Sequence, residues 1–195
     1  MSKYVFSDLH GNLELFNLIM KFFEEREQAG EKIEYYFLGD ACDRMNDGYE
    51  IMKSLLADER CVYIKGNHED MFIKAAKAIL KWKSENCLLT EEIQRMDIYE
   101  ICPYNDDVSL HLYNGGAATI NAWIKDGMPR NIVNLLAQLA VHCQVDNYDM
   151  CHAGVQWELW QENLDKESQE FKEECLWNRK HFNYDWEKDR ILIHG

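Results

Sequence analysis

The sequence predicts an α/β fold in which short strands alternate with amphipathic helices along the chain. Two observations support this fold class. In the first third, short runs of mainly apolar residues alternate with longer segments whose apolar residues recur every three or four positions, as on one face of a helix. Each short run is followed by a polar segment that contains glycine, which is typical of a strand that ends in a turn. This order predicts βαβ units around a parallel sheet.

Residues 1–82 contain six predicted elements. The first helix carries Leu13, Phe16, Met20 and Phe23 on one face, and Gly30 is its stop signal. A second helix and a third are recognised by the same spacing of apolar residues. The elements are, in order, a strand over Lys3–Phe6, a helix over Asn12–Arg26, a strand over Ile33–Leu38, a helix over Tyr49–Leu56, a strand over Cys61–Ile64 and a helix over Glu69–Trp82.

The rest of the chain is predicted to be mostly helical from Ser84 to about Leu139, with breaks at Gly115-Gly116 and at Gly127–Pro129. No internal repeat and no linker rich in proline, glycine or serine divides the sequence, and 195 residues suffice for one core. We therefore expect a single domain over residues 1–195 with a mostly helical insertion in its middle. The later predicted strands are Leu139–Val145, Tyr148–Cys151 and Ile191–Ile193.

Composition and charge exclude several classes of protein. The chain has 35 acidic and 21 basic residues and a net charge of −14, so its surface repels a nucleic-acid backbone. No apolar run approaches the ~20 residues that span a bilayer, and the first residues lack the apolar core of a signal peptide. Seven scattered cysteines without a C-x-x-C pair suit free thiols in a reducing compartment. We expect a cytoplasmic protein that binds neither nucleic acid nor membrane.

Polar segments at the ends of four predicted strands carry the candidate chemistry. In open α/β sheets, ligands bind at the edge where the carboxyl ends of the strands meet. Each segment holds aspartate, histidine or asparagine near a glycine, and glycine leaves room for a ligand close to the backbone. The four segments are Ser7–Asn12, Gly39–Arg44, Lys65–Asp70 and Cys151–Gly154.

Five side chains in these segments form a set of metal ligands. Asp8 and His10, two residues apart, can reach one ion together with Asp40, and Asp40 can bridge to a second ion held by Asn67 and His152. Carboxylate, imidazole and amide oxygen suit manganese, iron or zinc. Two such ions clamp a phosphoryl group and generate a hydroxide nucleophile near neutral pH. We expect two divalent ions, most readily Mn²⁺, which would also reverse the negative field of an acidic protein at this point.

In their order and spacing, four blocks resemble the signature of the phosphoprotein phosphatase family, within the calcineurin-like metallophosphoesterase superfamily. The blocks are Asp8-x-His10-Gly11, Gly39-Asp40-x-x-Asp43-Arg44, Gly66-Asn67-His68-Glu69 and His152-Ala153-Gly154. The resemblance is to the compact bacterial and phage branch of serine/threonine protein phosphatases. It implies an α/β sandwich of two β-sheets flanked by helices, with the metals at one end.

The same resemblance implies roles for residues that do not bind metal. His68, paired with Asp43, would be the general acid that protonates the leaving oxygen, and Arg44 would hold phosphate oxygens. The segment Leu176–Arg179 is similar to a stretch that supplies a second phosphate-binding arginine, here Arg179. Arg44 as a surface ion pair and Arg179 as a packing residue are the simpler alternatives. Three histidines match no motif and are predicted to be structural: His111, His142 and His181.

Two positions depart from the family pattern. The glycine that usually follows the Asp-Arg pair is Met45 here, which predicts a reshaped loop with its chemistry kept. The last metal-binding histidine of the family follows a glycine on the final strand, whereas His194 precedes Gly195. The resemblance therefore implies a truncated form of a longer protein. Such a form would bind its second ion weakly unless His194 replaces the missing ligand.

Three functions fit these observations. The first is a Mn-dependent phosphomonoesterase that acts on phosphoserine, phosphothreonine or phosphotyrosine in proteins, or on small phosphate esters. A dinucleoside polyphosphate hydrolase would share the four blocks but also needs a nucleotide pocket, which the sequence does not locate. The alternative outside the enzymes is a metal-binding interaction module with little turnover. Hydrolysis of an aryl phosphate with and without added Mn²⁺ discriminates between the enzymes and the module.

Overall fold

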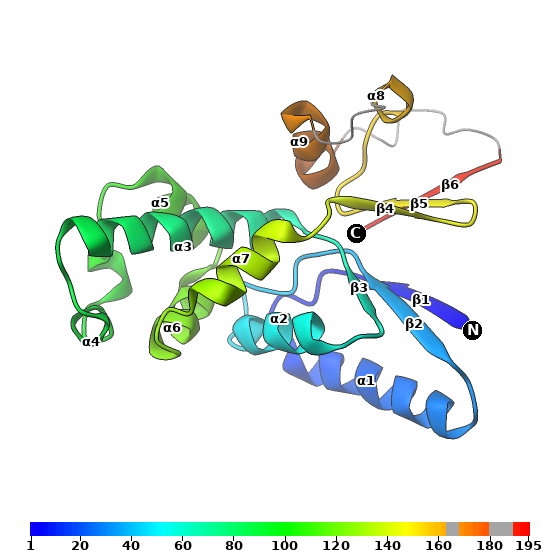
Figure 1. The fold of residues 1–195 in the computed structure, drawn as a ribbon, viewed down its shortest axis with the longest axis horizontal. Coiled ribbons are helices and arrows are strands. Elements are labelled where there is room, and N and C mark those ends of the chain that lie inside the picture. Colours follow the sequence, from blue (N-terminus) through cyan, green and yellow to red (C-terminus); the bar gives the residue numbers. More distant parts are fainter. Residues whose placement is uncertain (163–167, 180–188) are drawn as a thin grey trace.

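The computed structural model describes residues 1–162, 168–179 and 189–195. The first of the two sheets among these residues is parallel, in the order β1-β2-β3 (Figure 1). Phe6 lies opposite Phe37, and Phe37 lies opposite Tyr63. The three strands agree with the predicted ones to within one residue at each end. Their bounds are Ser2–Phe6 (β1), Ile33–Phe37 (β2) and Cys61–Tyr63 (β3).

Helices α1 (Leu13–Gln28) and α2 (Gly48–Ala57) cover one face of this sheet. The Asn12 side chain begins α1 by accepting a hydrogen bond from the backbone N–H of Leu15 at 3.0 Å. The alternation of side chains along β2 gives this face Tyr35 and Phe37, which pack with Phe16 and Phe23 of α1 in the main core. The βαβ arrangement predicted from the apolar spacing is confirmed.

The long helix α3 (Asn67–Glu85) leads into the helical insertion, which extends to one side of the sheets (Figure 1). Helices α5 and α7 pack against α3, which ties the insertion to the main core. The predicted breaks are confirmed, since Gly115-Gly116 separates α5 from α6 and Gly127–Pro129 separates α6 from α7. The helices of the insertion are α4 (Thr90–Ile93), the short 3₁₀ helix η1 (Ile98–Glu100), α5 (Asp106–Tyr113), α6 (Ala117–Lys125) and α7 (Arg130–Gln138).

The second sheet has the order β4-β5-β6, with β4 antiparallel and β6 parallel to the central β5. Strand β4 begins three residues later than predicted, because the Ala140 carbonyl accepts a hydrogen bond from the backbone N–H of Lys65 instead of joining the ladder. The bounds are His142–Val145 (β4), Tyr148–Cys151 (β5) and Ile191–His194 (β6). Helices α8 (Trp157–Glu162) and α9 (Gln169–Trp177) lie beyond this sheet, in a stretch for which the sequence predicted no element.

A small core joins the two sheets face to face. Tyr36 and Leu38 point from β2 and its extension toward Met150 of β5 and Ile193 of β6. On the outer face of the second sheet, Cys151 packs instead with residues of α8 and α9. The layers are therefore helices, sheet, sheet and helices, and the predicted two-sheet sandwich is confirmed. None of the described helices is long and apolar enough to cross a lipid bilayer.

Candidate metal centre

The polar segments after β1 and β2 run side by side because their backbones stay paired beyond the strands. The backbone N–H of Asp8 donates to the Gly39 carbonyl at 3.0 Å, and that of His10 donates to the Asp40 carbonyl at 2.9 Å. Asp8, His10 and Asp40 have φ angles of 54°, 45° and 63°, in the left-handed region that favours glycine. Each such residue costs about 1–2 kcal/mol, a strain that concentrates at functional sites.

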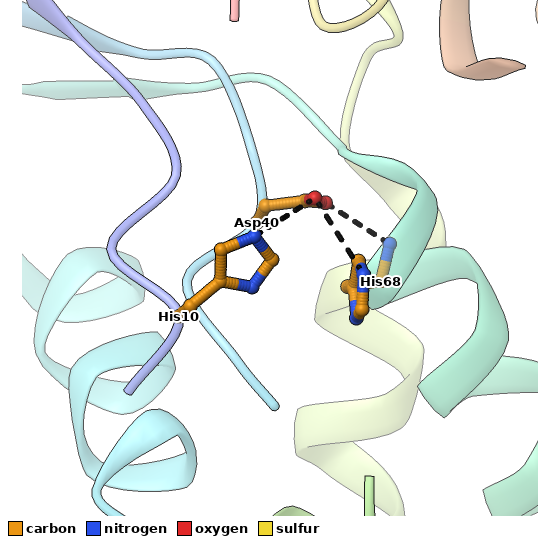
Figure 2. A group of neighbouring side chains, drawn as sticks. All are labelled: His10, Asp40 and His68. Atoms are coloured by element: carbon orange, nitrogen blue, oxygen red, sulfur yellow. Dashed lines mark hydrogen bonds and ion pairs between the residues drawn. The ribbon is translucent and has the colours of Figure 1, made fainter. Parts of the chain in front are cut away.

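Asp40 lies at the centre of the site (Figure 2). Its side chain is buried, and its Oδ1 accepts a hydrogen bond from the backbone N–H of His68 at 3.0 Å. Its Oδ2 lies 3.6 Å from Nε2 of His10, 3.3 Å from Nε2 of His152 and 3.9 Å from Nε2 of His68. Burial opposes ionisation of this carboxyl, but the neighbouring histidines outweigh it and lower its pKa. One carboxylate thus faces three imidazoles.

The structure brings all five predicted metal ligands together. Asp8 lies 3.6 Å from His10, and the Asn67 Oδ1 lies 2.9 Å from Nε2 of His152. Ligand atoms that lie within 4.8 Å of one another fall into two groups of three, one made of His10, Asp40 and His68 and the other of Asp8, Asp40 and His152. Asp40 belongs to both groups, which is the position expected of a bridging carboxylate.

Hydrogen bonds at Nδ1 of two histidines direct their Nε2 atoms toward Asp40. Nδ1 of His10 donates to the Cys42 carbonyl at 3.1 Å, and Nδ1 of His152 donates to the Leu38 carbonyl at 2.7 Å. Nε2 of His10 is buried without a hydrogen-bond partner. The Asp40 carboxylate lies near both atoms, and two ligands of one ion, each about 2.1 Å from it, would be separated by about 3–3.5 Å.

Acidic neighbours favour positive charge at this point. Burial alone would lower the pKa of His152, but the hydrogen bond to the Asp40 carboxylate raises that pKa to about 9. Burial acts in the same way on His10, and the Asp8 and Asp40 carboxylates outweigh it and raise its pKa. The pKa of Asp8 falls to about 2, because hydrogen bonds to its carboxylate outweigh its partial burial. A divalent ion can take the place of these protons, since it supplies positive charge to the same carboxylate, imidazole and amide donors, so the donor set fits divalent metal ions.

Glu69 holds the backbone around the site through hydrogen bonds. Its buried carboxylate accepts hydrogen bonds from the backbone N–H groups of Asp40 at 2.8 Å, Ala41 at 2.7 Å and Gly66 at 2.8 Å, and from the Tyr63 hydroxyl at 3.0 Å. The segments after β2 and β3 are therefore fastened to one side chain. Glu69 belongs to the Gly-Asn-His-Glu block, but the sequence pattern predicts no role for it.

The hydrogen bond expected between His68 and Asp43 is present. Nδ1 of His68 lies 2.8 Å from Oδ2 of Asp43, which is fully buried. The Nε2 atom of the same ring faces Asp40 and lies 3.5 Å from a guanidinium nitrogen of Arg44. Arg44 is exposed at the rim of the site. Met45, beside it, does not adopt a positive φ and its backbone N–H donates to the His10 carbonyl at 3.1 Å, so this turn does not require glycine.

Other residues of interest lie in different surroundings. His111, predicted to be structural, contacts Asp43 and is therefore part of the site. His142 packs edge-on against Trp160 and Phe171, as expected of a structural residue. Arg179 is exposed, and no hydrogen bond or ion pair joins it to another described residue. His181 lies outside the described residues.

A comparison with protein families aligns residues 1–189 with the calcineurin-like phosphoesterase family. The chain belongs to this family. Its two-sheet architecture and the convergence of aspartate, asparagine and histidine at one edge agree with membership of a metallophosphoesterase family. Among curated proteins, none matches the chain.

Several solved structures resemble this calcineurin-like domain. A metallophosphoesterase from Sphaerobacter thermophilus is 14% identical, with a TM-score of 0.45, over 78% of this chain and 46% of its own. A serine/threonine phosphatase from Saccharomyces cerevisiae is 20% identical, with a TM-score of 0.37, over 80% and 42%. A cold-active protein-tyrosine phosphatase of a Shewanella species is 14% identical, with a TM-score of 0.45, over 92% and 53%. The chain therefore spans about half the length of these proteins.

Proposed function

We propose that this chain hydrolyses phosphate monoesters with the help of two divalent metal ions, and that its substrates are phosphoserine, phosphothreonine or phosphotyrosine side chains or small phosphate esters. One observation carries the proposal. The buried Asp40 carboxylate lies between Nε2 of His10 and Nε2 of His152, directly beside the hydrogen-bonded pair of His68 and Asp43. The four sequence blocks further support assignment to the phosphoprotein phosphatase branch of the family.

The ligand set favours Mn²⁺, with Fe and Zn as alternatives, because carboxylate, imidazole and amide oxygen donors are combined without a thiolate. Bound there, the ions would neutralise phosphate charge and lower the pKa of water. We assign Asp40 to both ions. The other proposed ligands are Asp8, His10, Asn67 and His152, with Nε2 of each histidine directed into the site by the hydrogen bond at its Nδ1.

Two side chains at the rim would act on the phosphate itself. Arg44 can bind two phosphate oxygens through its planar guanidinium, and it lies beside Nε2 of His68. The Asp43 carboxylate accepts a hydrogen bond from Nδ1 of His68 and so fixes the orientation of the ring, which leaves Nε2 as the atom that would deliver a proton to the leaving oxygen. Arg179 is the second candidate for phosphate binding. Because the protein carries a net charge of −14, these cationic groups and the metal ions must supply the attraction for an anionic substrate.

Turnover of an aryl phosphate by the full chain, with and without Mn²⁺, tests this function. We expect hydrolysis that depends on Mn²⁺, and hydrolysis of phosphopeptides under the same conditions. Asp40→Asn should abolish turnover, because an amide cannot neutralise two cations. Near-wild-type activity of that variant would refute the two-metal mechanism. If the chain binds Mn²⁺, Fe²⁺ or Zn²⁺ but hydrolyses no phosphate ester, it is an interaction module; a preference for dinucleoside polyphosphates would support the alternative hydrolase.

A further inference from the structure

The turn that carries Asp43 and Arg44 is strained, and residues of the helical insertion hold it. Both residues have positive φ angles, 71° and 65°. The backbone N–H of Asp43 donates to the Thr119 hydroxyl at 3.1 Å, and that hydroxyl donates to Oδ1 of Asp43 at 2.7 Å. The backbone N–H of Arg44 donates to the Gly115 carbonyl at 3.1 Å. The turn therefore depends on contacts with a segment distant in sequence.

His111 of helix α5 makes the remaining contact of this insertion with Asp43. Its Nε2 lies 2.9 Å from the carboxylate, and the ring is fully buried. Phe72 of α3 lies edge-on to the same ring, with centroids 5.9 Å apart, which fixes its orientation. Asp43 thus lies between two imidazoles, His68 on the metal side and His111 on the insertion side.

The tautomer of His111 follows from its surroundings. Nδ1 is buried and has no hydrogen-bond partner. A proton on that atom would be a buried donor without an acceptor, whereas a lone pair there is tolerated at lower cost. His111 therefore donates a hydrogen bond from Nε2–H to the Asp43 carboxylate. This donor, together with Thr119, leaves Oδ2 of Asp43 directed at His68.

We propose that His111 is a positioning residue for the general acid: it fixes the Asp43 carboxylate, and through it the ring of His68. This inference rests on the proposed phosphatase function. It gives the helical insertion a part in catalysis, since His111, Thr119 and the Gly115 carbonyl together hold the turn from which Asp43 and Arg44 act.

Replacement of His111 by Leu and by Gln tests the proposal, with an alkyl and an aryl phosphate as substrates at saturating Mn²⁺. A general acid contributes about 10²–10⁴-fold for a poor leaving group, so loss of its orientation should lower kcat on the alkyl phosphate by about tenfold or more. The aryl phosphate, with its good leaving group, should lose much less. Gln can donate from nearly the same place as Nε2, so His111→Gln should retain most of the activity. KM and metal content should stay unchanged in both variants.

Val108→Ala is the matched control, because Val108 is buried on the same helix but belongs to the apolar core. It should lower the melting temperature and leave the ratio of alkyl to aryl turnover as it is. If His111→Leu does not fold, Gly116→Ala replaces it, since a Cβ there would overlap the His111 ring and displace it. An unchanged ratio in the folded variant would overturn the proposal.

An NMR measurement, which does not depend on turnover, tests the positioning role of His111 separately from the proposed phosphatase function. The Nδ1–H proton of His68, hydrogen-bonded to a buried carboxylate, should give a downfield imidazole signal in the NMR spectrum of the wild-type chain. We expect this signal to move or disappear in His111→Leu and to persist in His111→Gln. If the wild type hydrolyses neither substrate, the proposed function fails, while the NMR comparison still decides the positioning role. A His68 signal that is identical in all variants would refute that role.

Discussion

Glu69→Gln is the most informative single change. It replaces one oxygen of a carboxylate that accepts four hydrogen bonds with an NH₂ group, which can only donate. One carboxylate oxygen accepts from the N–H groups of Asp40 and Gly66, and the other accepts from the Ala41 N–H and the Tyr63 hydroxyl. In either orientation, the new NH₂ group faces at least one buried backbone N–H. An unsatisfied buried group costs about 1–3 kcal/mol, and hydrogen bonds to a charged acceptor contribute about 1.5–3 kcal/mol each. We expect a loss of about 2–4 kcal/mol.

Thermal unfolding of the metal-free protein measures this loss. For a chain of this size, about 2–4 kcal/mol corresponds to a fall in Tm of about 5–15 °C. Tyr63→Phe, which removes one of the four hydrogen bonds, is the control and should cost about 1 kcal/mol. Burial and the nearby Asp40 raise the pKa of Glu69, whereas the hydrogen bonds from its backbone donors stabilise the ionised form. If the Tm of Glu69→Gln lies within about 1–2 °C of the wild-type Tm, Glu69 is protonated in the native state. That result would refute the predicted loss of stability.

Three further predictions concern the metal site and its rim. Arg44→Lys keeps the charge but loses the planar pair of donors, so kcat/KM for phosphate esters should fall by about tenfold or more; an unchanged value would make Arg44 a surface residue. Gly66→Ala would press a methyl group against the Asp40 carboxylate, so calorimetry should find Mn²⁺ binding at least about tenfold weaker. Protons compete with metal for Nε2 of His10 and His152, and the pKa of His152 is about 9, so Mn²⁺ affinity should rise as the pH increases toward 9; a pH-independent affinity would exclude these ligands.

Sequence patterns sufficed for the parts of the fold and site that are local in the chain. Each of the strands that ends at the site carries its polar residues within a few positions of its last apolar residue, so Asp8, Asp40 and Asn67 could be assigned to one edge. Their convergence followed from parallel pairing, in which the carboxyl ends of β1, β2 and β3 must meet. The breaks in the helical insertion, at Gly115-Gly116 and Gly127–Pro129, are local signals of the same kind.

The contacts that depend on tertiary packing cannot be predicted from local sequence patterns. His111 lies 68 residues from Asp43, on a helix whose position is set by packing against α3, and no motif surrounds it. The donors to the Glu69 carboxylate are backbone N–H groups, which every sequence contains and no pattern marks. The sequence predicts no element over α8 and α9, because their charged residues obscure an apolar face that only the second sheet defines.

The hydrogen bond from His152 to the Leu38 carbonyl also bears on the order in which the molecule folds. The segments after β1, β2 and β3 come from the first part of the chain, whereas His152 follows Asn67 by 85 residues. During synthesis the N-terminal segments emerge first, and closing so long a loop carries an entropy cost that delays the contact. A nascent chain that ends after α3 therefore presents Asp40 without one of its imidazole partners. High-affinity metal binding should then coincide with docking of the second sheet. The rate of Mn²⁺ binding during refolding would therefore report the rate of this late folding step.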